Sequence, residues 1–131
     1  MKEKEMSFEL DRSLAGYHML MILSAVDGRF SGQEDTVIME YMDEEKLLGQ
    51  NLDQHTDFLS KLKKEDYLLH FSNAMDAYYM NSGSEERTHF LDLAMRLVMA
   101  DQKLTPGENL FIDELFNTWE ANYASDPMKV S

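Results

Sequence analysis

Leu23 to Met42 reads LSAVDGRFSGQEDTVIMEYM, and Leu97 to Phe116 reads LVMADQKLTPGENLFIDELF. The second stretch is a copy of the first, because an acid, a basic residue, a hydroxyl residue, a glutamate and an apolar stripe recur at the same spacing. The matched pairs are Asp27 and Asp101, Arg29 and Lys103, Ser31 and Thr105, Glu34 and Glu108, and Ile38 and Ile112. A repeat of this kind predicts one helix–turn–helix unit that is used twice.

Apolar residues at helical spacing continue outward from both copies, and no alternating strand pattern of any length occurs. We expect six helices and a frayed tail after Ser125. The first runs from about Ser7 to Val26, the second begins after Ser31, the third starts at about Leu52, the fourth runs from about Lys64 to Met80, the fifth starts at Ser84, and the sixth starts at Thr105.

Helix-start signals support the boundaries of the two copies. Ser31 is followed by Glu34 at capping-box spacing, and Thr105 is followed by Pro106 and Glu108. Ser84 is expected to cap the fifth helix, and Gly83 suits a left-handed end of the fourth. The fold class predicted is therefore all-α: a single domain over residues 1–131, a bundle of six to seven helices with two pseudo-twofold-related hairpins.

The composition bounds the classes of function. The chain has 131 residues, no cysteine and a formal net charge of −13. Such a surface repels phosphate backbones, so we expect no nucleic-acid partner, whereas cations or basic proteins fit the charge. The longest apolar stretch, from Met19 to Val26, is too short to span a bilayer, and no signal-type segment follows the charged start. We expect a cytoplasmic protein without membrane insertion.

The phrase Ala25-Val26-Asp27-Gly28-Arg29-Phe30-Ser31 with Glu34, and its second copy with Asp101, Thr105 and Glu108, resembles the signature of the tellurite-resistance TerB-like family. The resemblance covers most of the chain, although the middle matches loosely and Gln102 replaces the glycine in the second copy. It implies a helical bundle built around two hairpins. It also implies a stress-associated binding or sensing module rather than an enzyme.

Four acids are the candidate metal ligands: Asp27, Glu34, Asp101 and Glu108. Asp27 and Asp101 end helices, where an acid is electrostatically disfavoured. Each carboxylate either accepts N–H groups of the following turn, which is the commoner use, or helps to bind a divalent cation such as calcium. Glu34 and Glu108 suit the first turn of a helix, so capping is the favoured role for both. An EF-hand is excluded, because its third and twelfth loop positions hold Arg29 and Ile38.

A small helical metalloprotein or metalloenzyme is the alternative function. Glu86 and His89 have the Glu-x-x-His spacing of helical di-iron sites, but the second motif that such sites require is absent. His18, His55 and His70 have no partner at ligand spacing, so packing or surface roles are expected for them. No nucleophile elbow and no glycine-rich phosphate loop occurs, and no cofactor is expected apart from the possible cation.

The chain holds 11 methionines, and Met21, Met42, Met75, Met95 and Met99 fall at core-facing spacing. They are either flexible core filler, which fits the stripes better, or an adaptable groove for a partner helix. The sequence as a whole predicts a non-enzymatic TerB-like module that engages a protein partner or a cation through an acidic surface.

Overall fold

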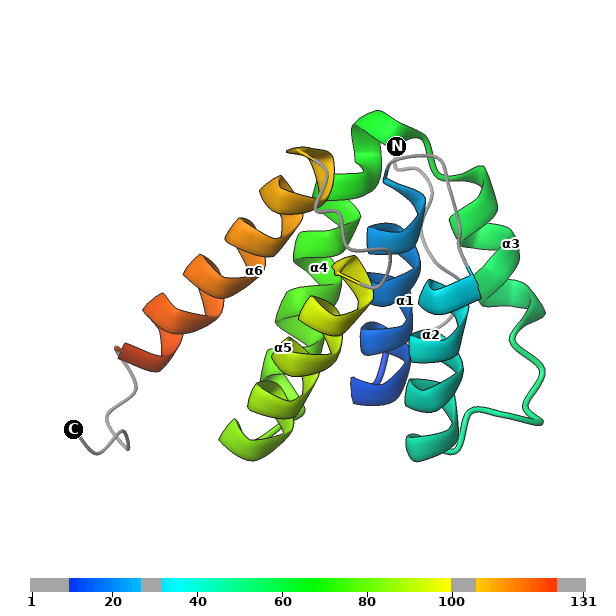
Figure 1. The fold of residues 1–131 in the computed structure, drawn as a ribbon, viewed down its shortest axis with the longest axis horizontal. Helices are drawn as coiled ribbons and strands as arrows, with labels where there is room; N and C mark the ends of the chain where they lie inside the picture. Colours follow the sequence, from blue (N-terminus) through cyan, green and yellow to red (C-terminus); the bar gives the residue numbers. More distant parts are fainter. Residues whose placement is uncertain (1–9, 27–31, 100–105, 125–131) are drawn as a thin grey trace.

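The structure, a computed structural model, describes residues 10–26, 32–99 and 106–124, with backbone only at 32–34, 106–108 and 120–124. These residues form six α-helices and no strand, which confirms the all-α class. The helices are α1 (Arg12–Ala25), α2 (Gly32–Glu44), α3 (Asp53–Lys61), α4 (Tyr67–Met80), α5 (Ser84–Val98) and α6 (Pro106–Ala124) (Figure 1). A 3₁₀ turn, η1 (Lys64–Asp66), leads into α4.

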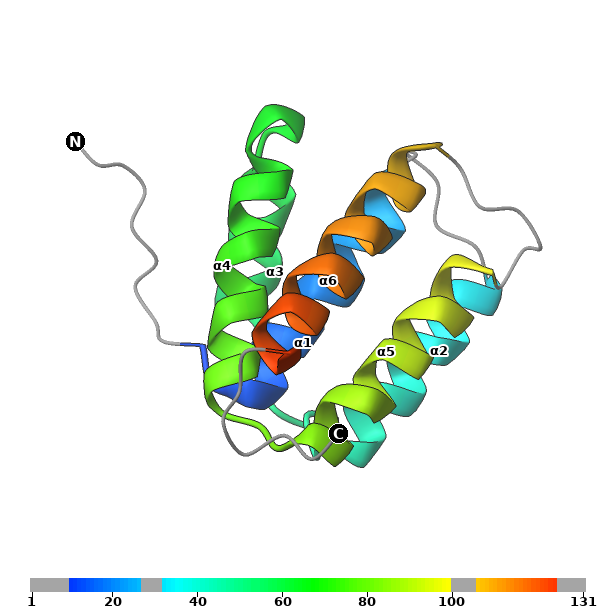
Figure 2. The same cartoon turned by 90° about the vertical axis from the view of Figure 1, so that its left-hand side faces the viewer.

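Helix α1 occupies the centre of the bundle and packs against α2, α3, α4 and α5, while α6 packs against α4 and α5. Figure 1 shows α1 between α4 on one side and α2 and α3 on the other. Figure 2 shows α2 and α5 side by side, away from α4. The central place of α1 agrees with its sequence, in which all residues from Ala15 to Leu20 are buried.

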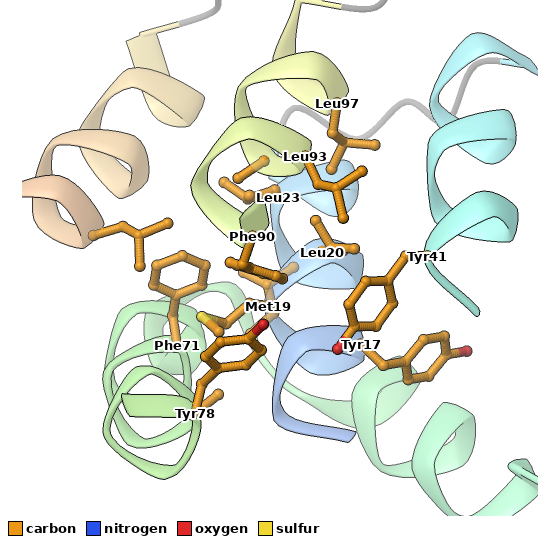
Figure 3. Close-up of a cluster of buried hydrophobic side chains, with 14 of the residues drawn as sticks. Tyr17, Met19, Leu20, Leu23, Tyr41, Phe71, Tyr78, Phe90, Leu93 and Leu97 are labelled. Atoms are coloured by element: carbon orange, nitrogen blue, oxygen red, sulfur yellow. The ribbon is translucent and has the colours of Figure 1, made fainter. Parts of the chain in front are cut away.

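The buried apolar core is built from α1, α2, α4, α5 and α6 (Figure 3). Phe90 of α5 lies at its middle, fully buried, with its ring near those of Tyr41, Tyr78 and Trp119. The matched apolar residues of the repeat are buried in both copies: Val37 and Ile38 in α2, and Phe111 and Ile112 in α6. The superposition of the two hairpins stays a prediction, because Asp27 and Asp101 lie outside the described residues.

One helix start and one helix cap differ from the predicted ones. Helix α1 begins at Arg12 rather than near Ser7, since Asp11 has an extended backbone and its Oδ1 accepts the Leu14 N–H at 2.8 Å. Helix α5 begins at Ser84, but Gly83 rather than Ser84 occupies the cap position. The Glu86 carboxylate reaches back to accept the Gly83 N–H at 2.8 Å. Gly83 is extended, with φ −95°, and does not form the left-handed helix end expected for it.

The cap of α1 gives a first testable result. Asp11→Ala is expected to lower the free energy of unfolding by about 1 kcal/mol, because the Leu14 N–H loses its acceptor. Urea unfolding followed by circular dichroism measures the change. Asp76→Ala, which removes an exposed acid inside α4, is the matched control and should stay within about 0.5 kcal/mol. Equal losses in the two variants would refute the capping role.

The methionines divide between core and surface. Met75 is fully buried, and Met21, Met42 and Met95 are half-buried against the core. Met99 is exposed, so its expected core position is wrong; it follows the last turn of α5, beyond the buried stripe. None of the helices in the described ranges combines the length and apolar character needed to cross a membrane.

Candidate functional site

The four predicted metal ligands lie outside the part of the chain whose side chains are described. Asp27 and Asp101 fall between helices, and Glu34 and Glu108 fall in the first turns of α2 and α6, where the backbone alone is described. The caps Ser31 and Thr105 also lie outside, although α2 and α6 begin directly after them. The calcium site and the capping roles therefore stay predictions.

The Glu86–His89 pair does not converge on a common point. Glu86 accepts a hydrogen bond from Arg12 at 3.0 Å and caps α5, whereas His89 Nε2 lies 2.9 Å from Glu44 Oε1 on α2. Among the described residues, no group of three or more His, Cys, Asp or Glu side chains is placed to hold a metal ion. These two side chains join helices instead: Glu86 links α5 to α1, and His89 links α5 to α2.

Carboxylates gather where α2 and α5 lie side by side. Glu40 and Glu44 on α2 bind Arg96 and His89 on α5. Asp43 on α2, and Glu85 and Asp92 on α5, lie three or four residues from these side chains and so share the same helix surfaces. We term these five acids the acidic face. Arg96 donates two hydrogen bonds to Glu40, at 2.8 and 3.0 Å. This bond raises the pKa of Arg96 and lowers the pKa of Glu40, and the nearby charges of Asp92 and Glu44 further raise the pKa of Arg96. Arg96 and His89 are outnumbered by the acids around them.

The other two described arginines are half-buried and bind groups at helix ends. Arg12 Nη2 lies 2.8 Å from Glu45 Oε1, which also accepts the Ser13 hydroxyl at 2.7 Å. Arg87 donates to the carbonyls of Tyr79 and Ser82 and lies 4.0 Å from the centre of the Tyr79 ring. Both guanidinium groups join helix ends, and the two carboxylates that Arg12 binds, Glu45 and Glu86, directly follow Glu44 and Glu85 of the acidic face.

A second cluster consists of three histidines, which we term the histidine chain. His18 on α1 lies between His55 on α3 and His70 on α4. Its Nε2 is 2.9 Å from His55 Nδ1, and its Nδ1 is 2.8 Å from His70 Nε2. All three side chains are buried. Treating these histidines as isolated was wrong, because the packing of three helices brings them together.

The hydrogen-bond count determines how the protons can be arranged. A neutral imidazole donates from one ring nitrogen and accepts at the other. His18 bonds a neighbour with each nitrogen, so it donates to one histidine and accepts from the other. Two arrangements satisfy this rule: the donors point from His55 towards His70, or all of them point the opposite way.

Burial keeps the histidine chain neutral. Loss of hydration, together with the nearby His70 and His55 rings, lowers the pKa of His18 to about 3. Burial lowers the pKa of His70 to about 4. Burial also lowers the pKa of His55, although the Asp11 carboxylate acts in the opposite direction. Near neutral pH the three rings are thus uncharged partners of one another.

Comparison with known proteins identifies no relative. No family model, no curated protein and no solved structure matches this chain. The acidic face and the histidine chain are therefore interpreted from their own chemistry.

Sequence reasoning missed the histidine chain, although one signal was present. His18 lies within the apolar run from Tyr17 to Leu23, and His70 directly precedes the buried Phe71. A histidine in such surroundings is buried, and a buried polar ring requires a hydrogen-bond partner. The signal predicts that partners exist, but it does not say which residues they are.

Proposed function

We propose that this chain is a non-enzymatic, TerB-like binding module of the stress-associated kind, and that its acidic face engages a basic protein partner. The observation that carries the proposal is the excess of acidic over basic side chains among the described residues of that face, where Glu40, Glu44 and Asp92 surround the guanidinium of Arg96. Complementary charge accelerates encounter and selects the partner. The repeated sequence motif supports the TerB-like part of the proposal.

Exposed methionines favour a protein rather than a small cation as the partner. Met39 on α2 and Met99 at the end of α5 have exposed fractions of 44% and 46%. Met39 lies one helical turn from Asp43 of the face, and Met99 lies one turn from Arg96, which binds Glu40 of the face. Residues at this spacing are neighbours on a helix surface. Unbranched thioether side chains adapt to varied apolar partners. The surface thus suits a segment that carries both basic and apolar side chains.

The test uses a fluorescent helical peptide of lysine and leucine residues, with binding followed by anisotropy. Asp43→Asn/Glu85→Gln/Asp92→Asn is expected to weaken binding by about tenfold, equivalent to ~1.4 kcal/mol. The matched control is Glu65→Gln/Asp76→Asn/Asp113→Asn, which removes the same charge from η1, α4 and α6. It should weaken binding by less than about threefold, since charges beyond a Debye length are screened. Equal weakening by both variants would overturn the assignment of the face.

A separate titration tests the hypothesis that the chain binds a divalent cation. Calorimetric titration of chelator-treated protein with calcium tests Asp27, Glu34, Asp101 and Glu108, and Asp27→Ala/Asp101→Ala is the variant that removes the predicted ligands. Heat that persists in this variant would show that Asp27 and Asp101 are not required ligands, and would remove the predicted four-acid site. Peptide binding that is lost in the acidic-face variant while calcium binding is unchanged would separate the two functions.

A further inference from the structure

Helix α3 is attached to the bundle differently from the other helices. Its only buried side chain is His55, which is 6% exposed, and none of its residues belongs to the buried apolar core. Phe58 and Leu59 within α3, and Leu52 and Leu62 at its ends, are half-buried, and the Phe58 ring lies against the same histidines. Docking of α3 on α1 therefore centres on a titratable ring that bonds His18 at 2.9 Å.

Protons disturb this attachment in two steps. A first proton can be accepted by the bonding pattern, because a charged His18 donates from both nitrogens to its two neighbours. That charge is nevertheless disfavoured by burial. A second proton on His55 or His70 places two N–H groups against each other. It also puts two positive charges on rings whose centres are 5.2 or 5.0 Å apart.

Other described groups face the histidine chain from the elements packed around it. From α1 come Asp11, whose charge raises the pKa of His55, and Tyr17, whose ring meets that of His18 edge-on. From α3 comes the apolar ring of Phe58, which lies 6.1 Å from the centre of His18 and 4.8 Å from that of His70. From α4 comes His70 itself. The charge of Asp11 favours a protonated His55 in the docked state, and so opposes the release of α3 by acid. Burial has the larger effect, and the pKa of His55 is lowered overall.

We propose that α3 docks on the bundle only while the histidine chain is neutral, and that mild acidification releases α3 while α1, α2, α4, α5 and α6 stay packed. The remaining helices share an apolar core to which α3 contributes no buried residue, so they keep their main source of stability. Release exposes His18 and His70 to water. This inference concerns α3 and does not depend on the proposed role of the acidic face.

The direction and size of the effect follow from proton linkage. A histidine that is neutral in the docked state and titrates near 6.5 in the released state binds more protons when released. Its contribution to docking is fully present above pH 6.5 and is lost as pH falls from there towards the lowered pKa values, about 4 for His70 and about 3 for His18. Between pH 7 and pH 5 the opening equilibrium of α3 should rise by about 25-fold for each such histidine.

Hydrogen exchange of the intact chain, resolved by residue with NMR, tests the proposal. Protection factors of α3 amides should fall at least about 25-fold from pH 7 to pH 5, while those of α5 amides change by less than about threefold. The imidazole signals of His18 and His70 should report neutral rings at pH 7. Equal losses of protection in α3 and α5, or unchanged protection in α3, would overturn the proposal.

Variants separate the histidine chain from general effects of acid. His18→Leu/His55→Leu/His70→Leu replaces all hydrogen-bonding partners by apolar groups, and α3 should then keep its protection at pH 5. His89→Leu, which removes an exposed histidine outside the chain, should leave the pH response of α3 unchanged. A loss of response in His89→Leu would refute the assignment. If the triple variant fails to fold, the comparison of α3 with α5 in the unaltered protein decides alone.

Discussion

Phe90→Ala is expected to lower the free energy of unfolding by about 3–5 kcal/mol, the cost of removing a fully buried aromatic ring and leaving a cavity. Phe90 is 0% exposed, and its ring centre lies 5.9 Å from that of Tyr41, 4.8 Å from that of Tyr78 and 6.0 Å from that of Trp119. One side chain of α5 thereby contacts α2, α4 and α6. Natural domains are stable by about 5–15 kcal/mol, so this change removes a large share of the total.

Urea unfolding followed by the fluorescence of Trp119, the chain's one tryptophan, measures the effect of Phe90→Ala. Phe116→Ala provides the matched control, because Phe116 is half-buried against the same core. Its loss should be about half as large, in proportion to the smaller apolar area that it removes from water. Similar losses in the two variants would contradict the central role of Phe90.

Gly16→Ala is expected to destabilise the protein by about 2–3 kcal/mol, although alanine normally stabilises a helix relative to glycine by about 1 kcal/mol. A Cβ at position 16 would overlap the hydroxyl of Tyr41, and would lie 2.7 Å from Tyr41 Cζ and 3.1 Å from Phe90 Cε1. The Tyr41 ring cannot easily move away, because it is 1% exposed and its hydroxyl donates to the Ser13 carbonyl at 2.8 Å.

A double-mutant cycle with Tyr41→Phe checks the cause of this loss. Removal of the hydroxyl opens space at position 16, so the double variant should be more stable than the sum of the two single losses predicts, by about 1 kcal/mol or more. Additive losses would show that the cost of Gly16→Ala arises elsewhere than at the Tyr41 hydroxyl.

The helices could be predicted from the sequence because their signals are local. The repeated apolar stripe predicted that Ile38 and Ile112 lie in the core, and they do: Ile38 is 3% exposed and Ile112 is 6% exposed. Boundaries were less certain: helical spacing alone placed the start of the first helix near Ser7, whereas the bond from the Leu14 N–H to Asp11 sets it at Arg12. At the start of α5, Glu86 made Gly83 the cap by reaching back to its N–H.

The clusters could not be predicted in the same way, since they depend on how distant helices pack. His18, His55 and His70 come from three helices, and no spacing along the chain relates them. Glu86 and His89 have a metal-site spacing, yet Arg12 and Glu44 engage them separately. The acidic face likewise exists only because α2 and α5 lie side by side, as Glu40 and Arg96 show.

His18 bonds with both of its ring nitrogens, and this couples the tautomer of His55 on α3 to the tautomer of His70 on α4. When His55 donates to His18, His18 must donate to His70, and when His70 donates, His55 must accept. A contact that fixes the orientation of the proton at one end therefore fixes it at the other, through α1 and without any movement of the backbone. The direction of the two hydrogen bonds is therefore the same choice for α3 and for α4, although these helices approach α1 from different sides.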